Sequence, residues 1–494
     1  MSVRRNVIAN YLGQSWIALM GVVFLPLYIN YLGIEAYGLV GLFVTVQALF
    51  LLLDFGMTPT LSREMSRYGA TGSADTIRSV LRTMEYVSIV TTVVCAAVIW
   101  CLSGWVAESW IHVEKLPLDQ ASDAIAVMGA VAGLRLTEGL YRGAMIGLQR
   151  QVALNAFSAI LATIRWAGGV GVMAWWSPTI VAFFRWQAAV SLLTVIVLAH
   201  VVYRGLPITS SATRFSIHLL SDKITFSSGM MANAALALLL TQLDKVLLSR
   251  ILSLEAFGYY TMAATVASLV LQLVTPISQA YYPQLARQLA SNDIAGLKSS
   301  YRLSYQLVCS AVFPLGMLLA FYGDSILLLW TGSEVMAGTV FPLLMLLAIA
   351  NMLHGTMFMP NMLRLAYGWS WYAVKLNSVA VLVLVPAILW ATPRFGAVGA
   401  AWVWLVLNFG YIMLGIPYMH RKVLPGEMGK WFREGLFIPL LAVVAVMSFG
   451  NLVRPDSDQR ILTFVFLAVA WMTSVTAVIS FSSSLRSIIR DSMK

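Results

Sequence analysis

The feature that most constrains this chain is a helix-length apolar stretch that carries charge. The stretch from Ala124 to Leu148 is long enough to cross a bilayer. It contains Arg135, Glu138 and Arg142, and spacings of three and four residues place them on one helix face. A charge near the bilayer centre costs at least ~2.5 kcal/mol, so this face cannot contact lipid. We therefore expect it to line an aqueous cavity or a protein interior.

The composition indicates that the rest of the chain also lies in a membrane. Of its 494 residues, 60% are hydrophobic and 11% are charged, whereas soluble domains carry about 25% charged residues. The first apolar run is too long for a signal-peptide core and lacks a small-residue cleavage site, so we expect it to be retained as the first helix. The sequence predicts an all-α polytopic membrane protein.

Apolar runs separated by polar or Pro/Gly-rich loops predict fourteen spans. They cover residues 7–30, 38–60, 84–104, 124–148, 153–175, 180–202, 224–250, 258–281, 303–322, 337–363, 373–392, 397–419, 435–452 and 461–481. With the N-terminus inside, the inner loops hold 22 basic residues and the outer loops five, which predicts that both termini are cytoplasmic. Topology and contact with anionic membrane lipids explain most of the net charge of +11, so no nucleic-acid partner is expected.

The sequence contains an internal repeat at an offset of 220 residues. Residues 32–38 read LGIEAYG and residues 252–258 read LSLEAFG, and the loop residues that follow stay in register. One copy holds six spans, an even number, so the two copies share an orientation as a parallel repeat. The predicted domains are an N-terminal lobe (1–202), an interlobe linker (203–222), a second six-helix lobe (223–419), and two additional helices with a cytoplasmic tail (420–494).

Short motifs in both copies resemble a known family. They are LGIEAYG at 32–38, LDFGM at 53–57 leading into REMSR at 63–67, QLDKV at 242–246, and EAFGY at 255–259. Together they are similar to the polysaccharide-biosynthesis flippases, of the O-antigen or Wzx type, of the multidrug/oligosaccharidyl-lipid/polysaccharide exporter superfamily. Many members of the O-antigen branch have fewer spans than the fourteen predicted here. The lipid II flippase branch and other exopolysaccharide branches therefore stay open.

The resemblance implies a function and a set of partners. A member of this family moves an undecaprenyl-pyrophosphate-linked oligosaccharide from the cytoplasmic to the outer leaflet of the bacterial inner membrane by alternating access. The implied partners are this lipid-linked oligosaccharide, membrane lipids, a coupling ion (proton or sodium), a polysaccharide polymerase and a chain-length regulator.

Five basic residues lie within predicted spans, and they are Arg135, Arg142, Arg165, Arg185 and Lys245. A pyrophosphate and acidic sugars need cations, and arginine binds phosphate through its forked donors. We expect these residues to form a cationic substrate cavity, with Trp166 against a sugar face. Arg142 and Arg185 lie near span ends, where they could instead extend to the interface. For the mid-span Arg135 and Arg165, the alternative is a structural ion pair.

Three acidic residues also lie within spans, and each has a structural alternative to ion coupling. Glu138 could neutralise its arginine neighbours or carry a coupling proton or sodium ion. Asp54 could anchor a loop or pack between helices. Asp244 and Lys245 are sequence neighbours and do not share a helix face, so we expect each to have a partner elsewhere.

The sequence lacks signs of catalysis. It contains no GxxxxGK[ST] phosphate loop and no His/Cys/Asp cluster with metal-ligand spacing, so we expect no enzyme activity, cofactor or metal. The outer loops are too short for the extracellular domain expected of a polymerase. A drug/cation antiporter of the same superfamily is the other alternative, and five intramembrane cations against three acids disfavour it.

Overall fold

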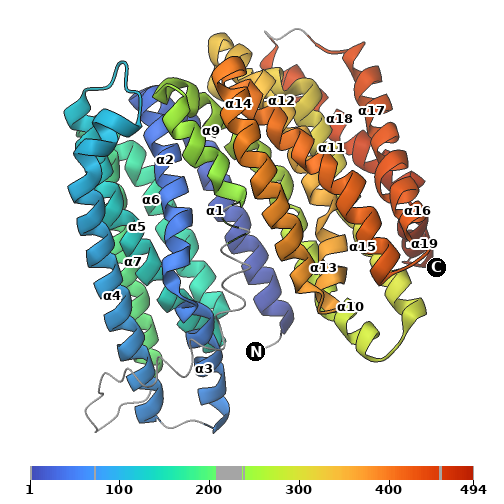
Figure 1. Cartoon of the computed structure of the whole chain (residues 1–494), viewed down its shortest axis with the longest axis horizontal. Coiled ribbons are helices and arrows are strands. Elements are labelled where there is room, and N and C mark those ends of the chain that lie inside the picture. The colour runs from blue at the N-terminus through green and yellow to red at the C-terminus, as the bar shows by residue number, and fades with distance from the viewer. Residues whose placement is uncertain are drawn as a thin grey trace. The chain divides into compact units, whose positions relative to one another are not determined.

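The computed structural model describes residues 3–71, 74–206, 236, 238, 240–455 and 459–492 (Figure 1). Nearly all of them are helical, and twelve helical segments among them are long and apolar enough to cross a membrane. The predicted all-α polytopic fold is therefore confirmed. The chain divides into two compact units, Met1–Gly258 and Tyr259–Lys494. The predicted linker 203–222 lies mostly outside the described residues, and the four-part division of the chain stays a prediction.

In the first unit, the charged stretch forms the central helix. The helices of this unit are α1 (Val3–Leu32), α2 (Ile34–Phe50), α3 (Met57–Thr71), α4 (Ala74–Trp105), α5 (Leu118–Gly147), α6 (Gln151–Trp175) and α7 (Ile180–Gly205). Helix α5 packs against α2, α3, α4, α6 and α7, and α1 packs along α6 (Figure 1). Because α5 has neighbours on most sides, its charged face lies inside the unit rather than against lipid.

The second unit is also helical. After α9 (Leu254–Gln272), which begins in the first unit, its helices are α10 (Val274–Ala290), α11 (Ile294–Thr331), α12 (Glu334–Thr356), α13 (Phe358–Ala366), α14 (Ser370–Gly410), α15 (Ile416–Val423), α16 (Met428–Lys430), α17 (Ile438–Asn451), α18 (Arg460–Phe481) and α19 (Ser483–Ser492). Helix α14 folds back at Gly396, whose φ of 60° and ψ of −149° suit glycine. One candidate span, Trp371–Val423, therefore holds two predicted spans, and most of the predicted span 224–250 lies outside the described residues.

Two predicted spans are interrupted in the structure. The prediction of one helix over 38–60 was wrong, because the chain turns at Phe55 (φ 47°) and Gly56 (φ 74°). The Asp54 carboxylate accepts hydrogen bonds from the Thr58 amide (3.1 Å) and hydroxyl (2.8 Å), which starts α3 as a helix cap does. In the predicted span 337–363, helix α12 ends at Thr356 and α13 follows, and both belong to one candidate span, Glu334–Ala366.

The repeated motif packs reciprocally within the first unit. A Cβ atom added at Gly38 would lie 2.4 Å from the carbonyl oxygen of Leu254, and one added at Gly258 would lie 2.3 Å from that of Ile34. The two contacts are related by the repeat offset of 220, since Ile34 corresponds to Leu254 and Gly38 to Gly258. Only glycine allows this approach, which explains the last residue of both motifs.

The glutamates of the same motif hold the loop before α5. Glu35 is buried and accepts hydrogen bonds from the backbone amides of Glu114 (2.6 Å), Lys115 (2.9 Å) and Leu116 (3.0 Å). The Lys115 ammonium forms an ion pair with Glu255 at 2.5 Å. One loop thus contacts both repeat-related carboxylates, one through its backbone and the other through its side chain.

Candidate functional site

The charged face of α5 borders a cavity of about 310 Å³ inside the first unit, which we call the arginine cavity. Helices α1, α2, α5, α6 and α7 all contribute to it. Its lining residues are Ile17, Val40, Phe43, Val44, Gln47, Arg135, Glu138, Arg142, Ser158, Leu161, Ala162, Arg165, Trp166, Phe183, Gln187 and Thr194. The charged face of α5 therefore lies at a cavity inside the unit, one of the two surroundings expected for it.

Glu138 joins two of the arginines across the cavity. Arg142 Nε donates to Glu138 Oε1 at 2.8 Å, one turn along α5, and Arg165 Nη2 on α6 lies 3.6 Å from Oε2. The carboxylate is only 5% exposed, and a charge buried to this extent requires partners. Arg142 also donates to the Ser158 hydroxyl at 3.0 Å, and Arg165 to that of Thr194 at 3.4 Å. Both guanidinium groups are thereby held in position.

Arg135 differs from the other two arginines. It lines the cavity one turn before Glu138, and its guanidinium has no hydrogen bond or ion pair to another described residue. Three arginines against one glutamate leave two positive charges in excess. Burying cations in excess of their counter-charge is costly, and a guanidinium offers donors in a geometry that suits phosphate and carboxylate. The cavity is therefore chemically suited to an anion.

Two adjacent glycines on α6 position the aromatic side of the cavity. A Cβ atom at Gly169 would lie 2.6 Å from the Tyr28 hydroxyl, and one at Gly168 would lie 2.3 Å from the Trp186 ring. Tyr28 can therefore reach α6, where its hydroxyl donates to the Trp166 carbonyl at 2.8 Å. The Tyr28 ring stacks on the Trp166 ring at 5.3 Å between centroids. Trp166 is thus held with its side chain along the cavity.

The structure brings together five of the nine predicted site residues, namely Arg135, Glu138, Arg142, Arg165 and Trp166. It places the other two predicted cations outside the arginine cavity. Arg185 is exposed and borders a separate shallow pocket with Asp123 and Trp100. Lys245 donates to Gln242 at 3.4 Å, one turn along its own helix.

The two remaining predicted acids also lie outside the arginine cavity. Asp54 caps α3, so its loop-anchoring alternative is the one that the geometry supports. Asp244 is buried but does not line the cavity. Residue type alone grouped these acids with Glu138, whereas they lie on other helical segments and not among the lining residues of the arginine cavity.

Sequence analysis missed the uncharged polar residues of the cavity. The hydroxyls of Ser158 and Thr194 accept hydrogen bonds from Arg142 and Arg165. Gln187 lines the cavity from α7. A sequence signal was available for α7, since Phe183, Gln187 and Thr194 are spaced by four and seven residues and share a helix face. Single uncharged polar residues are common in membrane helices, so this signal did not stand out.

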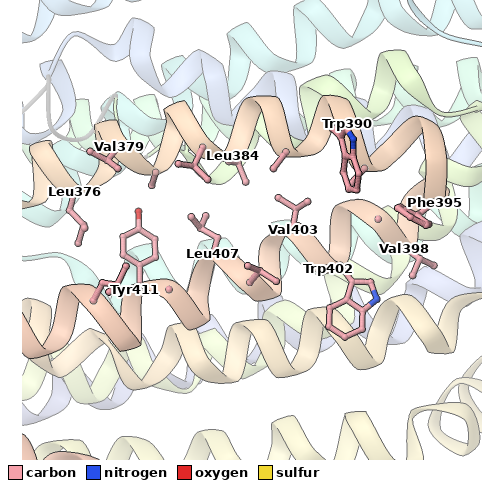
Figure 2. A pocket seen from close by; sticks show the side chains of 18 residues that line it. Leu376, Val379, Leu384, Trp390, Phe395, Val398, Trp402, Val403, Leu407 and Tyr411 are labelled. Carbon is pink, nitrogen blue, oxygen red and sulfur yellow. The ribbon is translucent and has the colours of Figure 1, made fainter.

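A second cavity lies in the second unit, between the two arms of α14, and we call it the α14 groove. Its volume is about 700 Å³, and none of the described residues that line it is charged. Figure 2 shows side chains from both arms directed into the gap, among them Val379, Leu384, Trp390, Val403 and Leu407. Within the described part of the chain, Tyr411 alone contributes a hydroxyl to the lining, and this hydroxyl donates to Asn377 at 3.1 Å. The groove therefore offers an almost wholly apolar surface.

Comparison with known proteins identifies the family. A family model described as polysaccharide biosynthesis protein matches residues 3–289, more than half of the chain and the whole of the arginine cavity. The chain belongs to this family. The resemblance inferred from the sequence motifs is thus confirmed. This polysaccharide biosynthesis protein is also 22% identical over 240 residues to the teichuronic acid biosynthesis protein TuaB of Bacillus subtilis (strain 168). That match covers 48% of each protein, so the chain spans about half the length of this curated relative.

Solved structures show the same fold. The lipid II flippase MurJ, in an inward closed conformation, matches with a TM-score of 0.72 and 12% identity over 99% of both chains. An inward-facing multidrug resistance transporter of the MATE family, from the MOP superfamily, matches with a TM-score of 0.67 and 13% identity. That match covers 84% of this polysaccharide biosynthesis protein and 96% of the transporter. At such identities the likeness establishes a multi-pass fold used by flippases and transporters.

Proposed function

We propose that this protein moves an undecaprenyl-pyrophosphate-linked oligosaccharide from the cytoplasmic to the outer leaflet of the bacterial inner membrane by alternating access. The observation that carries the proposal is the excess of two positive charges in the arginine cavity. A lipid-linked pyrophosphate supplies the missing negative charge, and arginine forks match its oxygens. The product would serve surface polysaccharide assembly, together with a polymerase and a chain-length regulator.

The ion pairs within the cavity suggest an order of events. Among the described residues, Arg135 forms no close ion pair with Glu138, unlike Arg142 and Arg165, and its buried Nε has no hydrogen-bond partner, so it would meet the incoming anion first. The anion would then compete with Glu138 for Arg142 and Arg165, and Glu138 would take up a proton when it is released. An inside-negative potential also favours outward movement of an anion, by about 2.3 kcal/mol per charge per 100 mV. Outward transport therefore has two candidate energy sources, coupling to a proton or sodium gradient and the membrane potential, and experiments must distinguish them.

Two alternatives within the superfamily remain as competing proposals. The fold match to MurJ is compatible with lipid II as the cargo, and the match to a MATE transporter with export of drugs. The cavity charge disfavours a cationic drug, because three arginines would repel it. Lipid II also carries a pyrophosphate, so only the glycan distinguishes it from the proposed cargo.

Reconstitution tests the proposal directly. The cargo would be the lipid-linked oligosaccharide that accumulates in a strain without this protein, placed in vesicles with purified protein. We expect the protein to increase the fraction of glycan cleaved by a membrane-impermeant glycosidase, with no change in glycan length. Transport of lipid II alone would support the first alternative, and transport of a cationic dye alone the second. A change in glycan length would indicate a polymerase.

The topology that we propose places both termini in the cytoplasm. Single cysteines introduced at Lys115, in the loop before α5, and at Ser177, between α6 and α7, should react with an impermeant reagent added from outside. A cysteine at Gly429, an exposed position between α15 and α17 where an added side chain meets no neighbour, should react only after permeabilisation. Outside labelling at Gly429 would contradict the proposed orientation.

A further inference from the structure

A buried glutamine in the arginine cavity lacks a hydrogen-bond donor. Gln187 lines the cavity from α7 and is only 4% exposed. Its side-chain oxygen, Oε1, accepts no hydrogen bond from any other described residue. A buried polar atom left in this way costs free energy, so it requires an explanation. Its position in the cavity points to a ligand.

Three aromatic rings line the same cavity as this glutamine. Phe183 lies one turn before it on α7, and Phe43 and Trp166 line the same cavity from α2 and α6. We call these three rings the aromatic wall. Tyr28 holds two of them, because it stacks on Trp166 and meets Phe183 edge-on at 5.0 Å between centroids. Rigid rings with a few placed polar groups are typical of sites that bind small organic ligands.

The chemistry of Gln187 Oε1 restricts which ligand groups can bind it. Arginine offers only donors, so Arg135, Arg142 and Arg165 suit phosphate or carboxylate oxygens. Gln187 Oε1 is an acceptor, and an ionised phosphate or carboxylate has no hydrogen to give it. A sugar hydroxyl can donate to this oxygen, and a neighbouring hydroxyl of the same sugar can accept from the amino group of the carboxamide. The apolar face of a sugar ring can pack on an aromatic ring.

We infer that Gln187 determines specificity by binding a hydroxyl of the sugar next to the pyrophosphate, while the aromatic wall packs against that sugar. This inference rests on the proposed function and adds a second recognition element to it. The arginines bind the charge that every polyprenyl pyrophosphate carries. Gln187 and the aromatic wall distinguish a lipid that carries a sugar from one that does not.

Binding measurements with two kinds of probe test the inference. The probes are undecaprenyl pyrophosphate and the same lipid carrying one sugar, in a panel of glucose, galactose and N-acetylglucosamine. Wild-type protein in detergent should bind at least one glycosylated probe more tightly than the bare lipid. Gln187→Met keeps the side-chain length but removes the amide. It should raise the Kd of that probe about three- to tenfold, as expected for one hydrogen bond, and leave the Kd of the bare lipid within about twofold.

Ser191→Ala is the matched control. Ser191 lies one turn further along α7, is fully buried, and its hydroxyl also has no partner among the described residues, but it does not line the cavity. Its removal should leave both affinities unchanged. The inference is overturned if wild type shows no preference for any glycosylated probe, or if Gln187→Met preserves that preference. An equal loss for both probes also overturns it, since a structural role would act in that way. If wild type binds neither kind of probe, the proposed function itself fails.

Discussion

The arginine cavity and the α14 groove are built from opposite chemistry, although membrane-spanning helices enclose both. The first is lined by three arginines and a glutamate, and the second by aliphatic and aromatic side chains without a charge. The internal repeat makes the contrast sharper. At the offset of 220, the positions of Arg135, Glu138 and Arg165 are occupied by Gly355, Phe358 and Val385.

This difference shows which part of the repeat the two copies share. Both retain the glycine at which α2 and α9 approach each other, so the requirement for close helix packing is common to them. Only the first copy carries the arginines. Charge inside a membrane is tolerated where a counter-charge and hydrogen-bond partners surround it, as Glu138, Ser158 and Thr194 do for two of the arginines.

Removing the unpaired cation should give the largest effect and would test whether the cavity acts through charge. We expect Arg135→Ala to abolish transport, a loss of at least ~100-fold, because the anion loses its free charged donor. Arg135→Lys should restore part of the activity, since the charge remains but the fork is lost. The measurement is the rate of cargo transport in vesicles that contain equal amounts of wild-type or variant protein.

Arg185→Ala is the control for that experiment, because Arg185 is an exposed arginine outside the arginine cavity. It should transport at the wild-type rate. If Arg135→Ala transports at the wild-type rate, or if only Arg185→Ala loses activity, then the location of an arginine in the cavity does not determine its importance for transport.

Placing a charge in the α14 groove tests whether this apolar cavity, unlike the arginine cavity, excludes charge. Val383 lines the groove and is 58% exposed, with no charged residue among the lining residues. We expect Val383→Arg to lower the yield of membrane-inserted protein, because an unpaired charge at this depth costs at least ~2.5 kcal/mol. Val383→Leu should insert normally. Equal yields of the arginine and leucine variants would mean that the groove tolerates charge after all.

Neutralising Glu138 should have a more selective effect on the arginine cavity. Glu138→Gln removes the carboxylate that Arg142 and Arg165 share, and the excess positive charge rises. We expect anion binding to persist while transport no longer follows an imposed ion gradient. Flux measured with and without a gradient, at fixed potential, tests this. If the variant responds to the gradient as wild type does, Glu138 is not the coupling group and the potential is the simpler energy source.

The smallest effect is expected for an ion pair of the second unit that lies at a helix end. Arg302 Nε and Nη2 donate to the two oxygens of Glu427 at 2.6 and 2.5 Å, which keeps the pKa of Glu427 below its usual value despite burial. A lowered pKa contributes stability that is present above the unfolded value of about 4.3 and is lost as the pH falls through the folded value.

Glu427→Gln should therefore lower the Tm at pH 7 by only a few degrees, about 1 kcal/mol. The difference from wild type should shrink as the pH falls below the unfolded value of about 4.3 and through the lowered pKa of the folded wild-type carboxyl. Thermal unfolding in detergent at a series of pH values measures both. A difference that stays constant down to low pH would assign the effect to packing instead of charge.

Much of the architecture could be predicted from the sequence, because it depends on local properties. Composition and run length predict the membrane helices, and the offset of 220 predicts the repeat. Spacings of three and four residues predict that Arg135, Glu138 and Arg142 share a face, since helix geometry alone determines it. Where the prediction of a continuous helix over 38–60 was wrong, the cause was also local, because Asp54 caps the helix that follows it.

The composition of the site required the tertiary structure. Arg165 and Arg185 each precede a tryptophan on neighbouring helices, and the sequence distinguishes them only by their distance from the span ends. Arg165 is 8% exposed and meets Glu138, whereas Arg185 is exposed at another pocket. The rotation of a helix about its axis decides which side chains enter a cavity, and that rotation depends on packing partners distant in sequence. On α6 these include Tyr28 and Trp186 against Gly169 and Gly168, contacts that no local pattern encodes.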